Sequence, residues 1–354
     1  MAAYGRFDFL WRVLPLTFSA FGLLAPQTIC AAERNWCEVL SIQGRSSLPL
    51  IASTLRERQN QPPSPLPRVH TEGTLPHQGI YDESIAAKKD LPVMLDAALA
   101  WHITADVAWL AMAQQYLLAW VETYQPSYNP IDETGFDALI DTYAIIRDTF
   151  SSTERARITQ FLERWAQGYL RSIDEQNQSK IWINNWQSHR VKLLTLIATA
   201  LDDHTLFEAA RTLFQKQLTV NIAKTGETED FEDRDALHYV VYDLQPLVQA
   251  ALAAQRRGED WYHWTTPDGA SLEKAVAWLT PYVSGQKNHE EFVNTHVRFD
   301  LIRLHAGEKG FSGLFDPHVA APLYWFASLL DPTLGPLAKG LSNTPPPFVA
   351  LCGL

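Results

Sequence analysis

The chain has 354 residues, of which 46% are hydrophobic and 11% aromatic, so it can bury a large core in one large domain or two small ones. Its formal net charge of -11 at pH 7 and its pI near 5.5 argue against a general nucleic-acid-binding protein.

The N-terminus has the pattern of a secretory signal. Arg6 and Arg12 precede the apolar run "VLPLTFSAFGLLAP", and small residues follow it, so a signal peptidase could cut after Ala32. The run is too short for a comfortable membrane span, although an uncleaved anchor is the alternative. We expect residues 1–32 to be removed and residues 33–354 to form one domain in a periplasmic or secreted protein, with no membrane contact after cleavage.

The chain has three cysteines, Cys30, Cys37 and Cys352, and Cys30 leaves with the signal. The other two lie near the ends of the mature chain and could form a disulfide in an oxidising compartment, with two free thiols as the alternative. No Cys/His cluster has zinc spacing, and "HEEFV" lacks the second histidine of a zincin motif because its fifth residue is Val293. We therefore expect no metal and no cofactor.

After the signal, a Pro-rich segment comes first. Residues 56–70, "RERQNQPPSPLPRVH", are predicted to form an extended arm because a regular helix does not accommodate these prolines. Beyond the arm, apolar residues recur at helical spacing almost to the end. The predicted helices are 91–104 with 105–124, 135–150 with 154–173, 185–203 with 204–222, and then 244–258, 271–285 and 321–331. Ser151 and Glu154 have the spacing of a capping box.

Strand signals are weak along the whole chain. Only "DALHYVVYDL", residues 235–244, is ambiguous, because it is rich in β-branched and aromatic residues and Pro246 follows. Successive helical hairpins pack as a solenoid or close into a toroid, and the absence of a clean repeat favours the toroid. The predicted fold class is all-α, an (α/α) toroid or incomplete helical barrel built from antiparallel helix hairpins.

Four polar stretches interrupt the amphipathic pattern, at residues 70–84, 182–190, 231–247 and 288–303. In the second, "WINNWQSHR", Asn185 and His189 are four residues apart and share one face of a helix, so both side chains could point at one ligand. The alternative is a buried core histidine with Asn184 as a helix cap. Trp182 and Trp186 flank the asparagines and could stack on sugar rings or pack in the core.

The third stretch places Arg234, His238, Tyr239 and Tyr242 within nine residues. An arginine can grip a carboxylate with two hydrogen bonds, and a tyrosine hydroxyl can give or take a proton. The alternative is that the tyrosines pack in the core and Arg234 pairs with neighbouring acids. Those acids indicate a solvated loop or, as a lesser alternative, a cation site.

"NNWQSHR", followed some fifty residues later by "RDALHY" and a Pro-containing helix, resembles the alginate lyase superfamily of polysaccharide lyases. The resemblance implies a secreted or periplasmic α/α toroid that cleaves polyuronates by β-elimination. Two positions depart from the family pattern. Trp186 stands where the family has a histidine directly after the asparagine pair, and Glu232 stands where it has an arginine seven residues before the tyrosine. The resemblance therefore implies a divergent branch, acting on alginate or a related mannuronate or glucuronate polymer.

The resemblance also implies roles for individual residues. Asn185, with Asn184 as an alternative, and Arg234 would neutralise the uronate carboxylate. His189 would assist neutralisation or act as the base, and Tyr239 would transfer protons. The other candidate substrate-binding residues are Asn184, Trp182, Trp186, Gln187, His77, His238, Tyr242, His289 and Arg298. An anionic polysaccharide needs a basic groove in this acidic protein, for which the candidates are Arg190, Lys192, Lys287, Arg298 and Arg303.

Two other functions fit the same sequence. A glycoside hydrolase would use Asp235 with Glu290 or Glu291 as its two carboxylates. A periplasmic polysaccharide-binding protein would bind without turnover. The sequence leaves open the uronate polymer, endo or exo action, the identity of the base and the oligomeric state.

Overall fold

The computed structural model describes residues 42–175 and 183–352. The chain divides into two units, Met1–Ala32 and Glu33–Leu354, and all described residues belong to the second. The signal peptide and Cys37 lie outside the described residues, and so does the side chain of Cys352, so the cleavage and the disulfide stay predictions.

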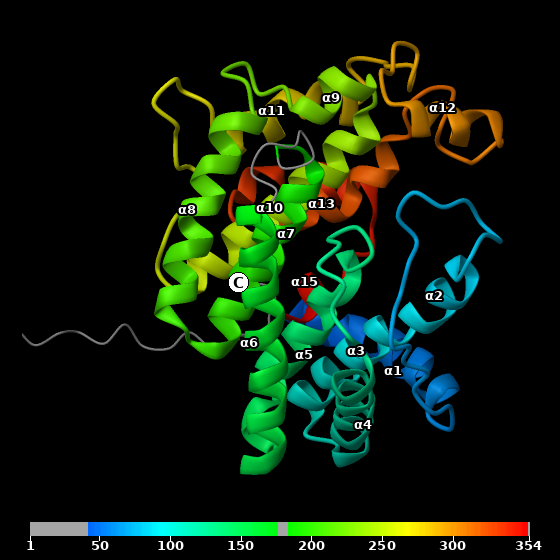
Figure 1. Cartoon of the computed structure of the whole chain (residues 1–354), viewed down its shortest axis with the longest axis vertical. Helices are drawn as coiled ribbons and strands as arrows, with labels where there is room; N and C mark the ends of the chain where they lie inside the picture. The colour runs from blue at the N-terminus through cyan, green and yellow to red at the C-terminus, as the bar shows by residue number, and fades with distance from the viewer. Residues whose placement is uncertain (1–41, 176–182, 353–354) are drawn as a thin grey trace, which may run out of the picture. The chain divides into compact units, whose positions relative to one another are not determined.

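The described residues form fifteen α-helices (Figure 1). They are α1 (Ile42–Arg58), α2 (Tyr81–Lys88), α3 (Asp90–Thr104), α4 (Val107–Thr123), α5 (Asp137–Ile146), α6 (Ser152–Glu175), α7 (Asn185–Leu201), α8 (His204–Asn221), α9 (Glu229–Arg234), α10 (Leu237–Arg256), α11 (Leu272–Val283), α12 (Arg298–His305), α13 (Ala321–Ala327), α14 (Gly335–Leu341) and α15 (Pro347–Cys352). Within the described ranges there is no β-strand, only three isolated bridges. None of the described helices combines the length and apolarity needed to cross a membrane.

The helices pack in two layers. Helices α3, α5, α7, α10 and α13 contact one another in that order and form the inner layer. Each helix of the other layer packs on one of these helices: α4 on α3, α6 and α8 on α7, α11 on α10, and α14 on α13. Burial follows this division, because nearly every side chain of α7 is buried whereas α6 buries one apolar stripe. The predicted fold class, an α/α toroid of antiparallel hairpins, is confirmed.

Helix ends follow the local rules of capping. The backbone N–H of Ser151 donates to the Glu154 carboxylate at 2.9 Å, and the N–H of Glu154 donates to the Ser151 hydroxyl at 3.3 Å. This reciprocal pair is the predicted capping box at the start of α6. Asn184 caps α7, since its side-chain oxygen accepts from the N–H of Trp186 at 3.1 Å.

Two boundaries differ from the sequence-based expectation. The ambiguous segment 235–244 is helical, and α10 continues through Pro246. Burial of this helix between α7 and α13 outweighs the preference of its β-branched and aromatic residues for strands. In the Pro-rich segment 56–70, α1 extends to Arg58, so the non-helical stretch begins after that residue.

Glu133 is a buried carboxylate that joins several elements. One oxygen accepts from the Tyr124 hydroxyl at 2.6 Å and from the backbone N–H of Ser127 at 2.7 Å. The other accepts from the indole N–H of Trp165 at 2.7 Å and from the Tyr169 hydroxyl. The carboxylate therefore ties the end of α4 and the middle of α6 to the segment before α5.

We expect Glu133→Gln to lower the free energy of unfolding by about 3 kcal/mol. Each carboxylate oxygen faces a group that can only donate, the Ser127 N–H on one side and the Trp165 N–H on the other. In either orientation, the NH2 group of the glutamine amide therefore faces one of these donors instead of an acceptor. Urea unfolding measures the loss, with Glu163→Gln on the exposed face of α6 as the control. A Glu133→Gln protein within about 0.5 kcal/mol of the parent would contradict this account.

Candidate functional site

A histidine, a threonine and a tyrosine meet where α7 and α10 pack together. Thr134 lies in the short 3-10 helix Thr134–Phe136 before α5. Its hydroxyl is 3.0 Å from Nδ1 and 3.3 Å from Nε2 of His189 on α7, and 3.1 Å from the hydroxyl of Tyr242 on α10. The rings of His189 and Tyr242 are 4.4 Å apart between centroids. Thr134 therefore connects the two rings by hydrogen bonds.

The imidazole of His189 is kept neutral by its surroundings. Only 3% of the residue is exposed, and burial lowers the pKa of His189 well below its usual range, with the charges of Lys192 and Lys88 acting in the same direction. The backbone carbonyl of Tyr242 opposes this shift. That carbonyl has no helical donor, because Pro246, four residues later, has no N–H. At neutral pH the ring can accept a proton but carries no charge.

Arg234 is held between two carboxylates. Its Nε is 3.0 Å from Oδ1 of Asp230, and its Nη1 is 2.5 Å from Oδ1 of Asp300 on α12. Asp230 also accepts from the backbone and the side-chain amide of Asn185, both at 2.7 Å. The predicted pair Asn185 and Arg234 therefore meets at one buried carboxylate, and both residues have internal partners.

Tyr239 lies between two arginines. The Arg234 guanidinium carbon lies 3.8 Å from the centroid of the Tyr239 ring, and Nη1 of Arg303 donates to the Tyr239 hydroxyl at 3.3 Å. The ring stands edge-on to Tyr242, with 6.2 Å between centroids. Burial raises the pKa of Tyr239, whereas the two arginines lower it and Asp300 raises it. The net pKa of Tyr239 is raised, and the two arginine charges offset only part of the effect of burial.

A second buried network fixes α7 against α8 and α10. Asp243 accepts from the Ser188 hydroxyl at 2.5 Å and from the Asn221 side-chain amide at 2.7 Å. The Gln217 amide donates to the Ser188 hydroxyl at 3.0 Å. These bonds leave little freedom for the turn of α7 that carries His189.

Residues 289–296, which we call the clasp, form hydrogen bonds with the turn between α9 and α10. The backbone carbonyl of Asp235 accepts from the N–H of Phe292 at 2.8 Å and from Nε2 of His289 at 2.9 Å. The Asp235 carboxylate accepts from the backbone N–H of Asn294 at 2.9 Å. Both Asp235 and Phe292 have left-handed backbones, with φ of 51° and 63°. The clasp thus holds two strained residues beside Tyr239.

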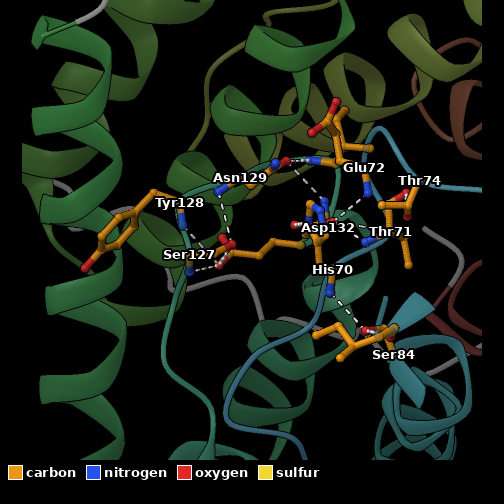
Figure 2. Close-up of polar contacts among 12 residues, drawn as sticks. His70, Thr71, Glu72, Thr74, Ser84, Ser127, Tyr128, Asn129 and Asp132 are labelled. Carbon is orange, nitrogen blue, oxygen red and sulfur yellow. Dashed lines mark hydrogen bonds and ion pairs between the residues drawn. The ribbon is translucent and has the colours of Figure 1, made fainter. Parts of the chain in front are cut away.

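The polar loop after the Pro-rich segment is anchored by Asp132 (Figure 2). The buried carboxylate of Asp132 accepts from the backbone N–H of Thr71 at 2.6 Å and of Glu72 at 2.9 Å, and Nδ1 of His70 lies 2.9 Å from it. Asp132 and Thr134 are separated by one residue. One short segment therefore anchors both the loop and the His189 cluster.

The structure brings together six of the predicted residues, through direct contacts or shared partners: Asn185, His189, Arg234, His238, Tyr239 and Tyr242. The His238 ring lies 4.6 Å from that of Tyr239, and burial lowers the pKa of His238 to about 4. His289 contacts Asp235, the residue that follows Arg234.

Other predicted residues lie apart from this cluster. His77 is exposed in the loop and pairs with Asp82 at 2.7 Å, and Arg298 is exposed at the start of α12. Gln187 is buried, and Trp186 is half-buried with the Arg190 guanidinium 5.5 Å from its ring centroid. Trp182 lies outside the described residues.

The expected lining of a basic groove needs a correction. Arg190 and Lys192 are each 2% exposed, because α7 belongs to the inner layer, so they do not line a surface groove. Lys287 and Arg298 are exposed, and the side chain of Arg303 is 23% exposed.

Sequence reasoning missed two residues of the cluster, Thr134 and Asp300, and it placed Asp230 among the acids of a solvated loop, whereas Asp230 is buried and pairs with Arg234. Thr134 ends the polar triplet "DET" between apolar residues, which is a signal that could have drawn attention to it. Within residues 42–175 and 183–352, no group of three or more His, Cys, Asp or Glu side chains could hold a metal ion.

Known proteins are similar to this chain in sequence and in fold. The family described as Alginate lyase matches residues 45–289. A polysaccharide lyase of Stenotrophomonas maltophilia (strain K279a) is 34% identical over 172 residues, 48% of this chain and 49% of that protein, so the chain matches about half the length of this curated relative.

Solved structures share the fold. An alginate lyase from Bacteroides ovatus has a TM-score of 0.62 at 14% identity, covering 88% of this chain and 93% of that chain. Alginate lyase A1-III from Sphingomonas species A1 has a TM-score of 0.53 at 17% identity, covering 71% and 78%. Since the family match extends from residue 45 to residue 289, well over half of the sequence, this chain belongs to the alginate lyase family.

Proposed function

We propose that the chain is a polysaccharide lyase that cleaves a polyuronate, alginate or a related mannuronate or glucuronate polymer, by β-elimination. The observation that carries the proposal is the cluster on α7, α9, α10 and α12. It combines a neutral imidazole, a tyrosine hydroxyl and two arginines. Membership of the alginate lyase family supports the same conclusion.

The reaction has three chemical requirements. The carboxylate of the uronate must be neutralised, because the adjacent C5 proton is barely acidic otherwise. A base takes the C5 proton, and the electrons of that C–H bond form the C4–C5 double bond. The C4–O4 bond then breaks, and an acid protonates O4 of the departing sugar. The product carries a 4,5-unsaturated uronate end.

The residues of the cluster can meet these three requirements. We assign protonation of O4 to Tyr239, whose hydroxyl lies beside arginine charge. His189 is suited to act as a base and not to neutralise the carboxylate, because its imidazole is uncharged. The charge that neutralises the substrate carboxylate is assigned to Arg234. Asn185 contributes by anchoring Asp230, and hence Arg234, to α7.

The hydrolase alternative is less compatible with the site. The carboxylate of Asp235 is occupied by the backbone and the side-chain amide of Asn294. Glu290 is exposed, whereas Glu291 is buried at the start of α10, where burial raises its pKa to about 8. The carboxylates of Asp235 and Glu291 thus hold residues 289–296 against the start of α10.

We expect the mature protein to produce unsaturated uronate ends from at least one polymer in a panel of polymannuronate, polyguluronate and glucuronan. Ultraviolet absorbance of the new double bond measures the reaction, and a reducing-sugar assay counts all cleavages. New reducing ends without the double bond would indicate the hydrolase. Binding without any new ends would indicate the non-catalytic binding protein.

We expect Tyr239→Phe to lower turnover by at least about a hundredfold while the protein stays folded and binds substrate. The change removes one oxygen and keeps the ring, so packing around Arg234 changes little. The matched control is Tyr143→Phe, which removes a buried hydroxyl bonded to Thr159, 3.1 Å away on α6. Melting temperature, affinity and rate are measured on the same preparations. A folded Tyr239→Phe protein with more than about a tenth of the parent rate would assign the proton to another group.

We also propose that residues 1–32 direct export and are removed, which places the enzyme in the periplasm or outside the cell. The basic and apolar pattern of the N-terminus supports this proposal. N-terminal sequencing of the protein from its native host should begin at Glu33. A sequence that begins at Met1 or Ala2 in protein from the membrane fraction would support the uncleaved anchor.

A further inference from the structure

Arg303 reaches the candidate proton-transfer group from a distant part of the chain. It lies on α12, 64 residues after Tyr239, and its Nη1 donates to the tyrosine hydroxyl. Its Nε donates to Glu308 at 2.9 Å, and its guanidinium carbon lies 4.3 Å from the ring centroid of Phe311. The side chain is therefore held on two further sides while one N–H points at the phenol oxygen.

The direction of this hydrogen bond has a consequence for the tyrosine. A guanidinium has donors only, so it cannot accept the proton of Tyr239. The phenol oxygen accepts from Arg303, and its own O–H must point elsewhere. Once that proton leaves, the same N–H becomes a charge-assisted hydrogen bond to the phenolate, which is stronger than a bond to the neutral phenol.

The two arginines next to Tyr239 differ in what they can do for its oxygen. Arg234 lies over the face of the ring, and its charge is opposed by the carboxylates of Asp230 and Asp300. Arg303 has one carboxylate partner, Glu308, and contacts the oxygen itself. Arg303 is thus the arginine that can stabilise negative charge on that oxygen.

We propose that Arg303 is a positioning residue for Tyr239, which directs the hydroxyl proton away from α12 and stabilises the phenolate formed when the proton is transferred. This proposal rests on the proposed lyase function. The proton goes from the Tyr239 oxygen to O4 of the leaving sugar, and the phenolate then takes a proton from solvent. The charged and titratable groups that face Tyr239 are Asp230, Arg234, His238, Tyr242, Asp300 and Arg303.

The test compares Arg303→Met, Arg303→Lys and the control Lys309→Met. Lys309 is an exposed cation on the same segment, so its loss removes equal charge without touching Tyr239. We expect Arg303→Met to lower kcat by about tenfold or more, Arg303→Lys to keep part of the rate, and Lys309→Met to match the parent. A double variant, Arg303→Met with Glu308→Gln, avoids leaving the Glu308 carboxylate without its partner.

Two further readouts separate positioning from a structural role. In a Tyr239→Phe background, Arg303→Met should change the residual rate by less than about twofold, because its effect passes through the missing hydroxyl. Nuclear magnetic resonance of carbon-labelled tyrosine, with the signal assigned by Tyr239→Phe, should show the pKa of Tyr239 rising in Arg303→Met. The sign follows because a cation favours the phenolate, so removal of the cation disfavours it.

Equal losses of rate in both backgrounds, or an unchanged Tyr239 titration, would overturn the proposal. If the parent makes no unsaturated product from any polyuronate, the lyase function fails. The titration still decides whether Arg303 controls the Tyr239 proton, so the two failures are distinguishable.

Discussion

Arg234 lies between Asp230 and Asp300, and this ion triad is the interaction on which the rest of the site depends. It joins α9 to α12, which are separated by more than sixty residues of chain. Through Asp230 it reaches the start of α7, where the backbone and amide of Asn185 donate to the same carboxylate. Removal of one member of a buried ion network leaves an uncompensated charge, which costs about 3–5 kcal/mol. The three elements are therefore fixed to one another.

The triad also determines where Tyr239 lies. The Arg234 guanidinium covers one face of the ring, and α12, held by Asp300, presents Arg303 to the hydroxyl. The clasp of 289–296 on Asp235 adds a second restraint on the same turn. A left-handed backbone at a residue other than glycine costs on the order of 1–3 kcal/mol, and both Asp235 and Phe292 adopt it. Their hydrogen bonds to each other and to Asn294 offset this strain.

The sequence predicted the helices well because helical periodicity is local information. The capping box at Ser151 and the polar start of α7 could be recognised from residues a few positions apart. The helical state of 235–244 could not, since its composition suits strand and helix alike and only burial between α7 and α13 decides. For the same reason Asp300 could not be assigned to Arg234, because the pairing exists only once the fold brings α12 near α9.

His189 is a buried residue that also belongs to a polar cluster. The sequence allowed either a buried core histidine or a ligand-facing one, and the structure shows a buried ring that takes part in a polar cluster. Burial is what keeps the imidazole neutral, and Thr134 joins it to Tyr242 and so to the neighbourhood of Tyr239. The core environment therefore keeps the imidazole uncharged at neutral pH.

The two departures from the family pattern have a common explanation in this geometry. Trp186 replaces the expected histidine, but His189 lies one helical turn after Asn185 and so occupies the same face of α7. Glu232 replaces the expected arginine and is exposed to solvent, so this position of α9 does not face Tyr239. Positive charge at the tyrosine is supplied by Arg234, two residues later, and by Arg303 from α12. The imidazole, the tyrosine and the guanidinium groups therefore come together even though the local motifs differ, because the fold and not the local motif determines which side chains meet.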